Sequence, residues 1–242
     1  MGTDIHSVVQ RKVNGIWQLE KVPPTLQSKY RNGNGNAYDQ WMYNYRAYDE
    51  RHYDVFAVLA DVRNGTGFAG VLTGYPVQPI SVPRGLPDDF ECKCPRYIDD
   101  EYPDDEDDSD SEYSQWAMGD HSFSWVTLRE LMEYPWQTGR VKVGVISFTE
   151  FAVRVQLNII DRPEDYSGMV SGPGVRVLSE AEAIQVLRNP SPNVDANKTY
   201  VQITWNQPII SEDDTLLVDW IPWMKTLDEN PDNVRMVFGF DS

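Results

Sequence analysis

The sequence is organised around residues 119–131, which read Gly119-Asp120-His121-Ser122-Phe123-Ser124-Trp125-Val126-Thr127-Leu128-Arg129-Glu130-Leu131. From His121 to Val126, aromatic rings alternate with smaller side chains, and this period of two residues is typical of a strand. Thr127 and Glu130 then stand at the spacing of a capping box, in which each side chain satisfies a backbone N–H of a starting helix. The stretch predicts a strand that runs directly into a capped helix, with a carboxylate, an imidazole and hydroxyls gathered near the strand's start.

Further strands are predicted at both ends of the chain. Residues 4–12 and 16–22 flank Asn14 and Gly15, and Asn-Gly is the strongest short signal for a β-hairpin. Residues 233–240 form an apolar run at the opposite end, and such a run usually belongs inside a sheet. We therefore expect both chain ends to lie in the core sheet.

The chain between these strands combines short helices with more strands. Residues 53–62 are apolar on nearly every side, which predicts a buried helix. Residues 141–146 and 198–210 read as strands. Ser147 and Ser179 each stand three residues before a Glu, so both are expected to cap a following helix.

These elements predict a single α+β domain over residues 1–242. Its sheet is expected to be mixed, mainly antiparallel, to contain both chain termini and to be flanked by helices. Residues 28–50 are rich in Tyr, Asn and Gly, and we interpret them as an ordered aromatic loop.

Charge is unevenly distributed along the chain. The formal net charge is −17, and ten of the 38 acidic residues fall within residues 99–112. Self-repulsion and a lack of apolar side chains predict an acidic, flexible insertion at about residues 88–114. The rest of the chain is also mildly acidic, which argues against binding of duplex nucleic acid, because such binding rests on many Lys and Arg contacts. The acidic run itself is compatible with mimicry of nucleic-acid phosphates.

Several classes of protein are excluded by the sequence. No apolar run approaches the roughly 20 residues of a membrane helix. The first residues lack the basic and apolar segments of a secretory signal. Cys92 and Cys94 are too few for a disulfide framework or a four-thiolate zinc site, and they fit a reducing compartment. We expect a cytoplasmic protein without membrane contact, and the sequence predicts no cofactor.

Two of the three histidines lie beside an aspartate. Asp4 and His6 are two residues apart, and Asp120 and His121 are adjacent. Imidazole is suited to proton transfer near neutral pH, and a neighbouring carboxylate can orient its tautomer. If the strands that carry them pair, His6 and His121 would face a common ligand as base and acid. These four residues are the predicted catalytic set.

Other polar side chains are predicted to contact the ligand. Arg63 or Arg84 would stabilise charge on a phosphoryl or carboxylate group, and Asn64 lies beside Arg63 in a Gly-rich turn. Ser122 or Ser124 would act as a nucleophile or only as a hydrogen-bond donor. Two alternatives stay open. The same Asp and His side chains would form a mixed nitrogen and oxygen metal site, although without the spacing of a known motif, or both histidines are buried and purely structural.

The sequence also resembles a family of uncharacterised proteins encoded by bacteriophages and prophages. The resemblance lies in Met1-Gly2-Thr3-Asp4-Ile5-His6, in LADVRNG at 59–65 followed by GFAG at 67–70, in PRGLP at 83–87, in GDHS at 119–122 with Trp125, and in VRMVFGFD at 234–241. It implies a phage origin and action in the cytoplasm of the bacterial host. It implies no established activity.

Two functions are therefore expected. The first is a phage accessory protein whose His, Asp and Arg side chains bind a small nucleotide-like or phosphate-bearing ligand. It would sequester that ligand or cleave its phosphodiester, and a host signalling nucleotide is the ligand that a phage context suggests. The second is a non-enzymatic acidic inhibitor that binds a host protein by imitating nucleic acid. Its signal is the acidic run at 99–112.

Overall fold

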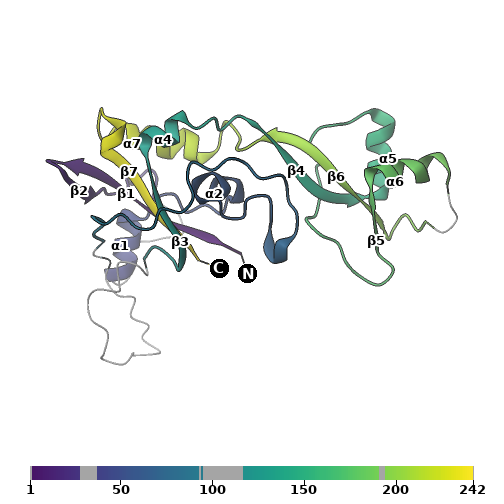
Figure 1. Cartoon of the computed structure of the whole chain (residues 1–242), viewed down its shortest axis with the longest axis horizontal. Helices are drawn as coiled ribbons and strands as arrows, with labels where there is room; N and C mark the ends of the chain where they lie inside the picture. Colours follow the sequence, from purple (N-terminus) through teal and green to yellow (C-terminus); the bar gives the residue numbers. More distant parts are fainter. Residues whose placement is uncertain (1, 28–36, 93, 95–116, 191–193, 242) are drawn as a thin grey trace, which may run out of the picture. The chain divides into compact units, whose positions relative to one another are not determined.

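The computed structural model describes residues 2–27, 37–92, 94, 117–190 and 194–241 (Figure 1). The chain forms two compact units. Unit 1 comprises Met1–Val62, Pro79–Pro135 and Ser211–Ser242, and unit 2 comprises Arg63–Gln78 and Trp136–Ile210. Each unit has its own sheet, and helices accompany both sheets. The predicted α+β class is confirmed. The sequence led us to expect one domain with one sheet, whereas the structure has two compact units with a sheet in each.

Unit 1 is built on a four-stranded antiparallel sheet in the order β2-β1-β7-β3. Its first two strands, β1 (Asp4–Val13) and β2 (Ile16–Leu19), form the predicted hairpin. Asn14 and Gly15 make the turn with φ values of 51° and 83°. Both angles lie in the left-handed region that a two-residue hairpin of this type requires, which explains the Asn-Gly pair.

The last strand lies between the first and the third. β7 (Val234–Asp241) pairs with β1 along nearly its whole length, so that the two terminal strands lie side by side (Figure 1). Its other edge pairs with β3 (His121–Thr127), which is the strand predicted from the alternation at 121–126. The prediction that both terminal strands belong to the core sheet is confirmed.

Short helices accompany this sheet. They are α1 (Ala37–Tyr45), α2 (Tyr53–Ala60), α4 (Leu128–Glu133), the π-helical turn η2 (Leu216–Trp220), α7 (Ile221–Lys225) and the 3-10 turn η3 (Pro231–Asn233). The capping box of α4 is confirmed: Thr127 Oγ1 accepts from Glu130 N–H at 3.2 Å, and the Glu130 carboxylate accepts from Thr127 N–H at 2.8 Å. Helix α2 is buried over seven of its eight residues, as its composition predicts.

Helix α1 corrects one prediction. The loop expected over residues 28–50 contains a helix at its centre, and residues 28–36 lie outside the described part of the chain. Tyr and Asn are weak helix formers, so local propensity does not favour this helix. Trp41 and Met42 bury one side of it in the core of unit 1, and we attribute the helix to this packing.

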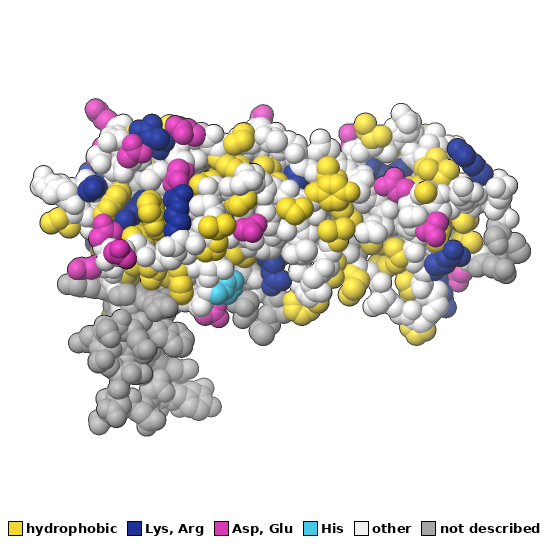
Figure 2. Space-filling model, viewed as in Figure 1, with side chains coloured by type: hydrophobic (Ala, Val, Ile, Leu, Met, Phe, Trp, Pro, Cys, Tyr) yellow, Lys and Arg dark blue, Asp and Glu magenta, His cyan; other side chains and the backbone are white. Residues whose placement is uncertain are grey.

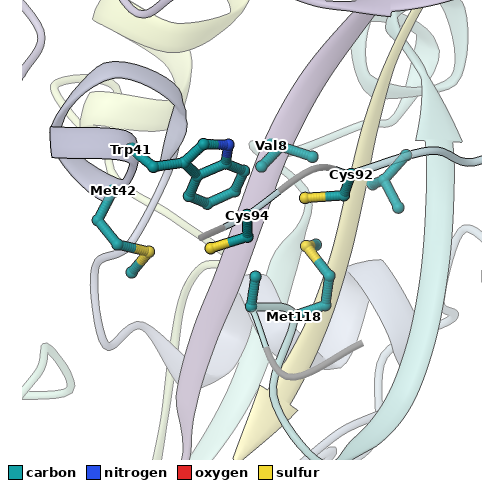
Figure 3. Packing of buried hydrophobic residues seen from close by; sticks show 8 residues of the cluster. Val8, Trp41, Met42, Cys92, Cys94 and Met118 are labelled. Atoms are coloured by element: carbon teal, nitrogen blue, oxygen red, sulfur yellow. The ribbon is translucent and has the colours of Figure 1, made fainter. Parts of the chain in front are cut away.

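Sulfur-containing side chains form part of the core around α1. Met42, Cys92, Cys94 and Met118 are buried together with Val8, Trp41, Ala117 and Val237 (Figure 3). Burial raises the pKa of both thiols to about 12. At neutral pH the two cysteines therefore stay protonated and pack as small apolar side chains.

A buried arginine lies on the same sheet. The Arg235 guanidinium stands 4.1 Å from the ring centre of Trp17 and 5.8 Å from that of Trp125. Its Nε donates to Gln10 at 2.9 Å and its Nη2 donates to Asp89 at 2.8 Å. Burial lowers the pKa of Arg235, whereas Asp89 and the two aromatic faces favour the charged form. The cation therefore joins strands β1, β2, β3 and β7.

Unit 2 contains a three-stranded sheet in the order β4-β6-β5. The long strands β4 (Gly139–Ser147) and β6 (Thr199–Pro208) are antiparallel, and the short β5 (Arg176–Ser179) runs parallel to β6. Helices α5 (Phe148–Leu157) and α6 (Glu180–Arg188) pack on one face of this sheet. A 3-10 turn, η1 (Phe68–Gly70), lies in the first segment of the unit. Ser147 and Ser179 cap α5 and α6 as predicted.

The acidic run at 99–112 lies outside the described residues, as does most of the insertion expected at about 88–114. Within the part of the chain that the structure describes, no helix is long and apolar enough to cross a membrane.

Candidate functional site

Both predicted Asp and His pairs lie at one end of the unit 1 sheet. In the strand register Asp4 stands opposite Asp241, where β1 begins and β7 ends. His121, the first residue of β3, stands opposite Phe240. We call this place the terminal sheet end: the beginnings of β1 and β3 with the end of β7 between them. The structure thus brings together residues that are more than 100 positions apart in the sequence.

The two histidines do not face a common ligand in the way the sequence suggested. Strands β1 and β3 do not pair, because β7 lies between them. His6 is opposite Gly239, whereas His121 is opposite Phe240. Neighbouring residues of a strand point to opposite faces of a sheet, so the two imidazoles lie on opposite faces. The expected base and acid pair is therefore replaced by two separate clusters.

The first cluster joins the ends of the terminal strands. His6 Nε2 lies 2.7 Å from Asp241 Oδ2, and the other Asp241 oxygen accepts from Asp4 N–H at 3.3 Å. Arg51 donates two hydrogen bonds of 2.6 Å to the Asp4 carboxylate, from Nε and Nη2. Such a bidentate pair is the strongest geometry for a guanidinium and a carboxylate. One imidazole, two carboxylates and one guanidinium thus form a connected network.

The Arg51 contact favours the ionised form of Asp4. The hydrogen bond from Arg51 is the main cause that holds the pKa of Asp4 below its ordinary value, and partial burial opposes it. We expect Arg51→Ala to raise the pKa of Asp4 toward 3.8, measured by NMR titration of the carboxyl carbons. A carboxyl with a depressed pKa stabilises the fold above its unfolded pKa, and this stabilisation is lost as pH falls through the folded value. The variant should lack that acid-sensitive part of the stability. An unchanged Asp4 titration would contradict the ion pair.

The second cluster is made of three consecutive residues. His121 Nδ1 lies 2.9 Å from Ser122 Oγ, and His121 Nε2 lies 3.9 Å from Asp120 Oδ1. The imidazole stacks on the Phe240 ring with centroids 6.0 Å apart and planes 24° apart, and 37% of its side chain is exposed. The aromatic contact holds the ring in place while one part of it faces solvent.

Backbone strain shapes this cluster. The register of β3 against β7 shifts between His121 and Ser124, and Ser122 lies in this irregularity with φ of 52°. A left-handed serine costs about 1–3 kcal/mol, and residues held in this way concentrate at functional sites. Gly119 reaches the site with φ of 89°, and a Cβ there would lie 2.4 Å from Phe240 O. Because Gly119 has no side chain, Asp120 N–H can approach and donate to Phe240 O at 2.7 Å.

The order of groups in the second cluster has a chemical meaning. When Ser122 donates its proton to His121 Nδ1, the ring proton is on Nε2, on the side of Asp120. Hydroxyl, imidazole and carboxylate in this order are the arrangement that activates a serine as a nucleophile. The distance of 3.9 Å to Asp120 exceeds a hydrogen bond, and catalytic contacts of this kind often tighten only when substrate binds.

Two other predicted ligand contacts hold the fold. Ser124 is buried, and its Oγ accepts from Arg84 N–H at 3.1 Å. The Arg84 guanidinium donates to the two Glu130 oxygens at 2.6 and 3.0 Å and lies 4.9 Å from the Trp125 ring centre. Burial raises the pKa of Glu130, but hydrogen bonds from Arg84 and Thr127 outweigh it and hold this pKa below its ordinary value. Through these contacts with Ser124 on β3 and Glu130 on α4, Arg84 holds the Pro-rich loop at 79–87 against both elements.

The remaining predicted contacts, Arg63 and Asn64, belong to unit 2. Arg63 Nη1 donates to Gly67 O at 3.2 Å. Asn64 exchanges two hydrogen bonds with the Val77 backbone, at 2.7 and 2.8 Å. The two bonds between Asn64 and Val77 bring the ends of the segment at 63–78 together.

Sequence reasoning missed Asp241, Arg51 and Phe240. Asp241 reaches the site because the two terminal strands pair, which the sequence did not predict: their antiparallel register places the last residue of β7 opposite the first residue of β1. Phe240 is brought beside His121 by the register of β3 against β7. No sequence signal points to Arg51, which lies in the irregular segment before α2. His52, the third histidine, caps α2 by accepting from Val55 N–H at 3.3 Å and stands 3.6 Å from Asp214.

Metal binding finds no support among the residues that the structure describes, because no three His, Cys, Asp or Glu side chains there are arranged to hold an ion. Comparison with protein-family models, with curated proteins and with solved structures finds no match. The phage family therefore stays a prediction. Fold and site together define an α+β protein with a hydroxyl, imidazole and carboxylate cluster at the end of its terminal sheet.

Proposed function

We propose that the terminal sheet end binds a small nucleotide-like ligand through a phosphate group, and that His121 and Ser122 act on its phosphodiester bond. The observation that carries the proposal is the hydrogen bond of 2.9 Å between His121 Nδ1 and Ser122 Oγ, made at a strained serine. A strained, hydrogen-bonded serine beside a partly exposed imidazole is costly to maintain for structure alone.

The proposed reaction uses the side chains already in place. Ser122 Oγ attacks phosphorus as its proton passes to His121 Nδ1, so that an Oγ–P bond forms while the ester P–O bond breaks. His121 then gives this proton to the departing ester oxygen. In the second step the neutral imidazole takes a proton from water, whose oxygen attacks phosphorus as the Oγ–P bond breaks. The imidazolium then returns this proton to Ser122 Oγ. Asp120 stabilises the imidazolium that forms between these proton transfers.

The cluster of His6, Asp241, Asp4 and Arg51 contributes charge near the proposed site. Arg51 is more than half exposed and lies next to the two carboxylates of the strand ends, so it offsets part of the repulsion that they exert on an anionic ligand. In a bacterial cell infected by a phage, which the family resemblance implies, a host signalling nucleotide is the first ligand class to test. The alternative, an acidic inhibitor that imitates nucleic acid, rests on residues 99–112, outside the described part of the chain.

A screen of cyclic and linear nucleotides tests the proposal by thermal shift and by product formation. We expect at least one ligand to raise the melting temperature. Turnover of that ligand should fall by roughly 10³-fold or more in Ser122→Ala, because the nucleophile is lost. Ser171→Ala, at an exposed serine of unit 2, is the matched control and should keep wild-type turnover.

Binding without cleavage has a different signature. A ligand that is only sequestered would shift the melting temperature of wild type without product, and His121→Ala would abolish the shift. Absence of both shift and product across the whole panel would refute the proposed function.

A further inference from the structure

Unit 2 carries most of the exposed hydrophobic side chains. Among the described residues, eleven of the fifteen large hydrophobic side chains that are exposed belong to this unit. Five of them fall within residues 153–160, on α5 and just after it, and we call them the α5 apolar patch: Val153, Val155, Leu157, Ile159 and Ile160. Figure 2 shows hydrophobic side chains at the surface in the part of the molecule that carries α5 and α6.

Two residues of the patch form a second apolar stripe on α5. Phe148 and Phe151 point inward and pack in the core of unit 2. Val153 and Leu157 are four residues apart, so they lie together on the outside of the same helix, where polar side chains are usual. Leu157 is 63% exposed.

The end of the helix extends the patch. Asn158 adopts the left-handed conformation that stops α5, with φ of 53°. Ile159 N–H then donates back to Arg154 O at 2.9 Å, which folds the chain against the last helical turn. Ile160 follows this turn and is 77% exposed, the highest exposure of any large hydrophobic side chain that the structure describes. Ile159 and Ile160 therefore add exposed apolar side chains at the end of the helix, next to Leu157 in the sequence.

Charge distinguishes unit 2 from the rest of the chain. Its residues carry eight basic and seven acidic side chains, a formal net charge of +1, whereas unit 1 carries thirteen basic and 31 acidic side chains. Two copies of a chain with net charge −17 repel each other wherever unit 1 surfaces meet. Contact through unit 2 avoids most of this repulsion.

The immediate surroundings of the patch suit self-association. Residues 148–162 contain Glu150 and Asp161 as acids, with Arg154 and Arg162 as bases. In a two-fold contact each surface meets a copy of itself, so it must carry both signs of charge to be complementary. This segment does so in equal number, around an apolar centre.

We propose that the α5 apolar patch is the surface by which two copies of this chain pair about a two-fold axis, with Leu157 near its centre. The partner is a second copy because the neutral, apolar surface is the part of this acidic chain that such a copy approaches without net repulsion. Packing α5 against its counterpart would remove both apolar stripes from water at once. The inference is independent of the proposed function of unit 1.

Sedimentation equilibrium of the full chain at about 1–100 μM tests the proposal, because dimerisation depends on concentration. We expect wild type to form dimers within this range and Leu157→Asp to weaken the association at least about 100-fold, since each dimer would bury two unpaired carboxylates. Val82→Asp is the matched control: Val82 is 70% exposed in unit 1 and should not matter. Melting curves of both variants verify that they remain folded.

Salt provides a second readout. Raising ionic strength from about 0.05 to 0.5 M should not weaken the dimer, because salt also screens the remaining repulsion between the acidic chains and leaves the apolar contact intact. A wild-type chain that stays monomeric up to the highest concentration overturns the proposal. So does a dimer that Leu157→Asp leaves unchanged, or one that Val82→Asp weakens as much as Leu157→Asp does.

Discussion

Replacement of Gly239 by alanine should destabilise unit 1 by about 2–4 kcal/mol or prevent its folding, because the added methyl group has no space. A Cβ at this position would lie 2.2 Å from Met118 O and 2.6 Å from Phe123 Cδ1. The first neighbour is backbone and the second is a ring on the adjacent strand. Gly239 lies on β7, which is hydrogen-bonded to β1 on one side and β3 on the other, so the strand cannot shift without disturbing both ladders.

Urea unfolding measures the effect, and Gly168→Ala is its control. A Cβ at Gly168 in unit 2 would meet only Val71 at 3.6 Å, an ordinary van der Waals distance. That variant should change the free energy of unfolding by no more than about 1 kcal/mol, since alanine also reduces the freedom of the unfolded chain. Equal effects of the two substitutions would show that close packing at the terminal sheet end is not the cause.

Phe240→Ala should cost about 3–5 kcal/mol of folding stability, which is typical for removal of a fully buried phenylalanine. The Phe240 ring has no exposed surface, and it contacts Phe56 edge-on at a centroid distance of 5.0 Å and Phe238 at 5.8 Å. It also supports the His121 ring by stacking. The substitution should therefore lower turnover at the site even at temperatures where the variant is folded.

Chemical unfolding and the turnover assay distinguish these two effects. Phe68→Ala serves as a control, because Phe68 is 65% exposed and its loss should change stability by less than about 0.5 kcal/mol. Phe240→Leu keeps an apolar side chain of nearly the same volume and should recover much of the stability without restoring the stack on His121. Full activity in a folded Phe240→Leu protein would contradict the supporting role of the ring.

Local patterns predicted most elements of this fold. The Asn-Gly hairpin, the capping boxes of α4 and α6 and the buried helix α2 each depend on residues within a few positions of one another, so the sequence displays them directly. Helix α1 was missed because its formation depends on packing of Trp41 and Met42 against distant segments. The division into two units also depends on long-range contacts, and no stretch of the sequence with the composition of a linker marks the boundary between them.

The candidate site was predicted in part. The locations of Asp4, His6 and His121 at strand beginnings followed from alternation, but the order of strands did not. Because β7 stands between β1 and β3, the two histidines belong to opposite faces and each has its own partners. Strand order depends on contacts among all the strands of the sheet, so it cannot be predicted from the sequence of any single segment. Arg84 was assigned to a ligand for the same reason: its partner Glu130 is 46 residues away.

The central position of β7 has a consequence for synthesis. A ribosome makes β1 and β3 long before β7, and the His6–Asp241 pair spans 235 residues. Until β7 emerges, the edges of β1 and β3 that will pair with it remain open, and contacts of such sequence separation form slowly. The nascent chain therefore carries both open strand edges, which are prone to pairing with other chains, from the synthesis of β3 until that of β7. Cellular yield of this protein should depend on chaperones that shield those edges until the last strand arrives.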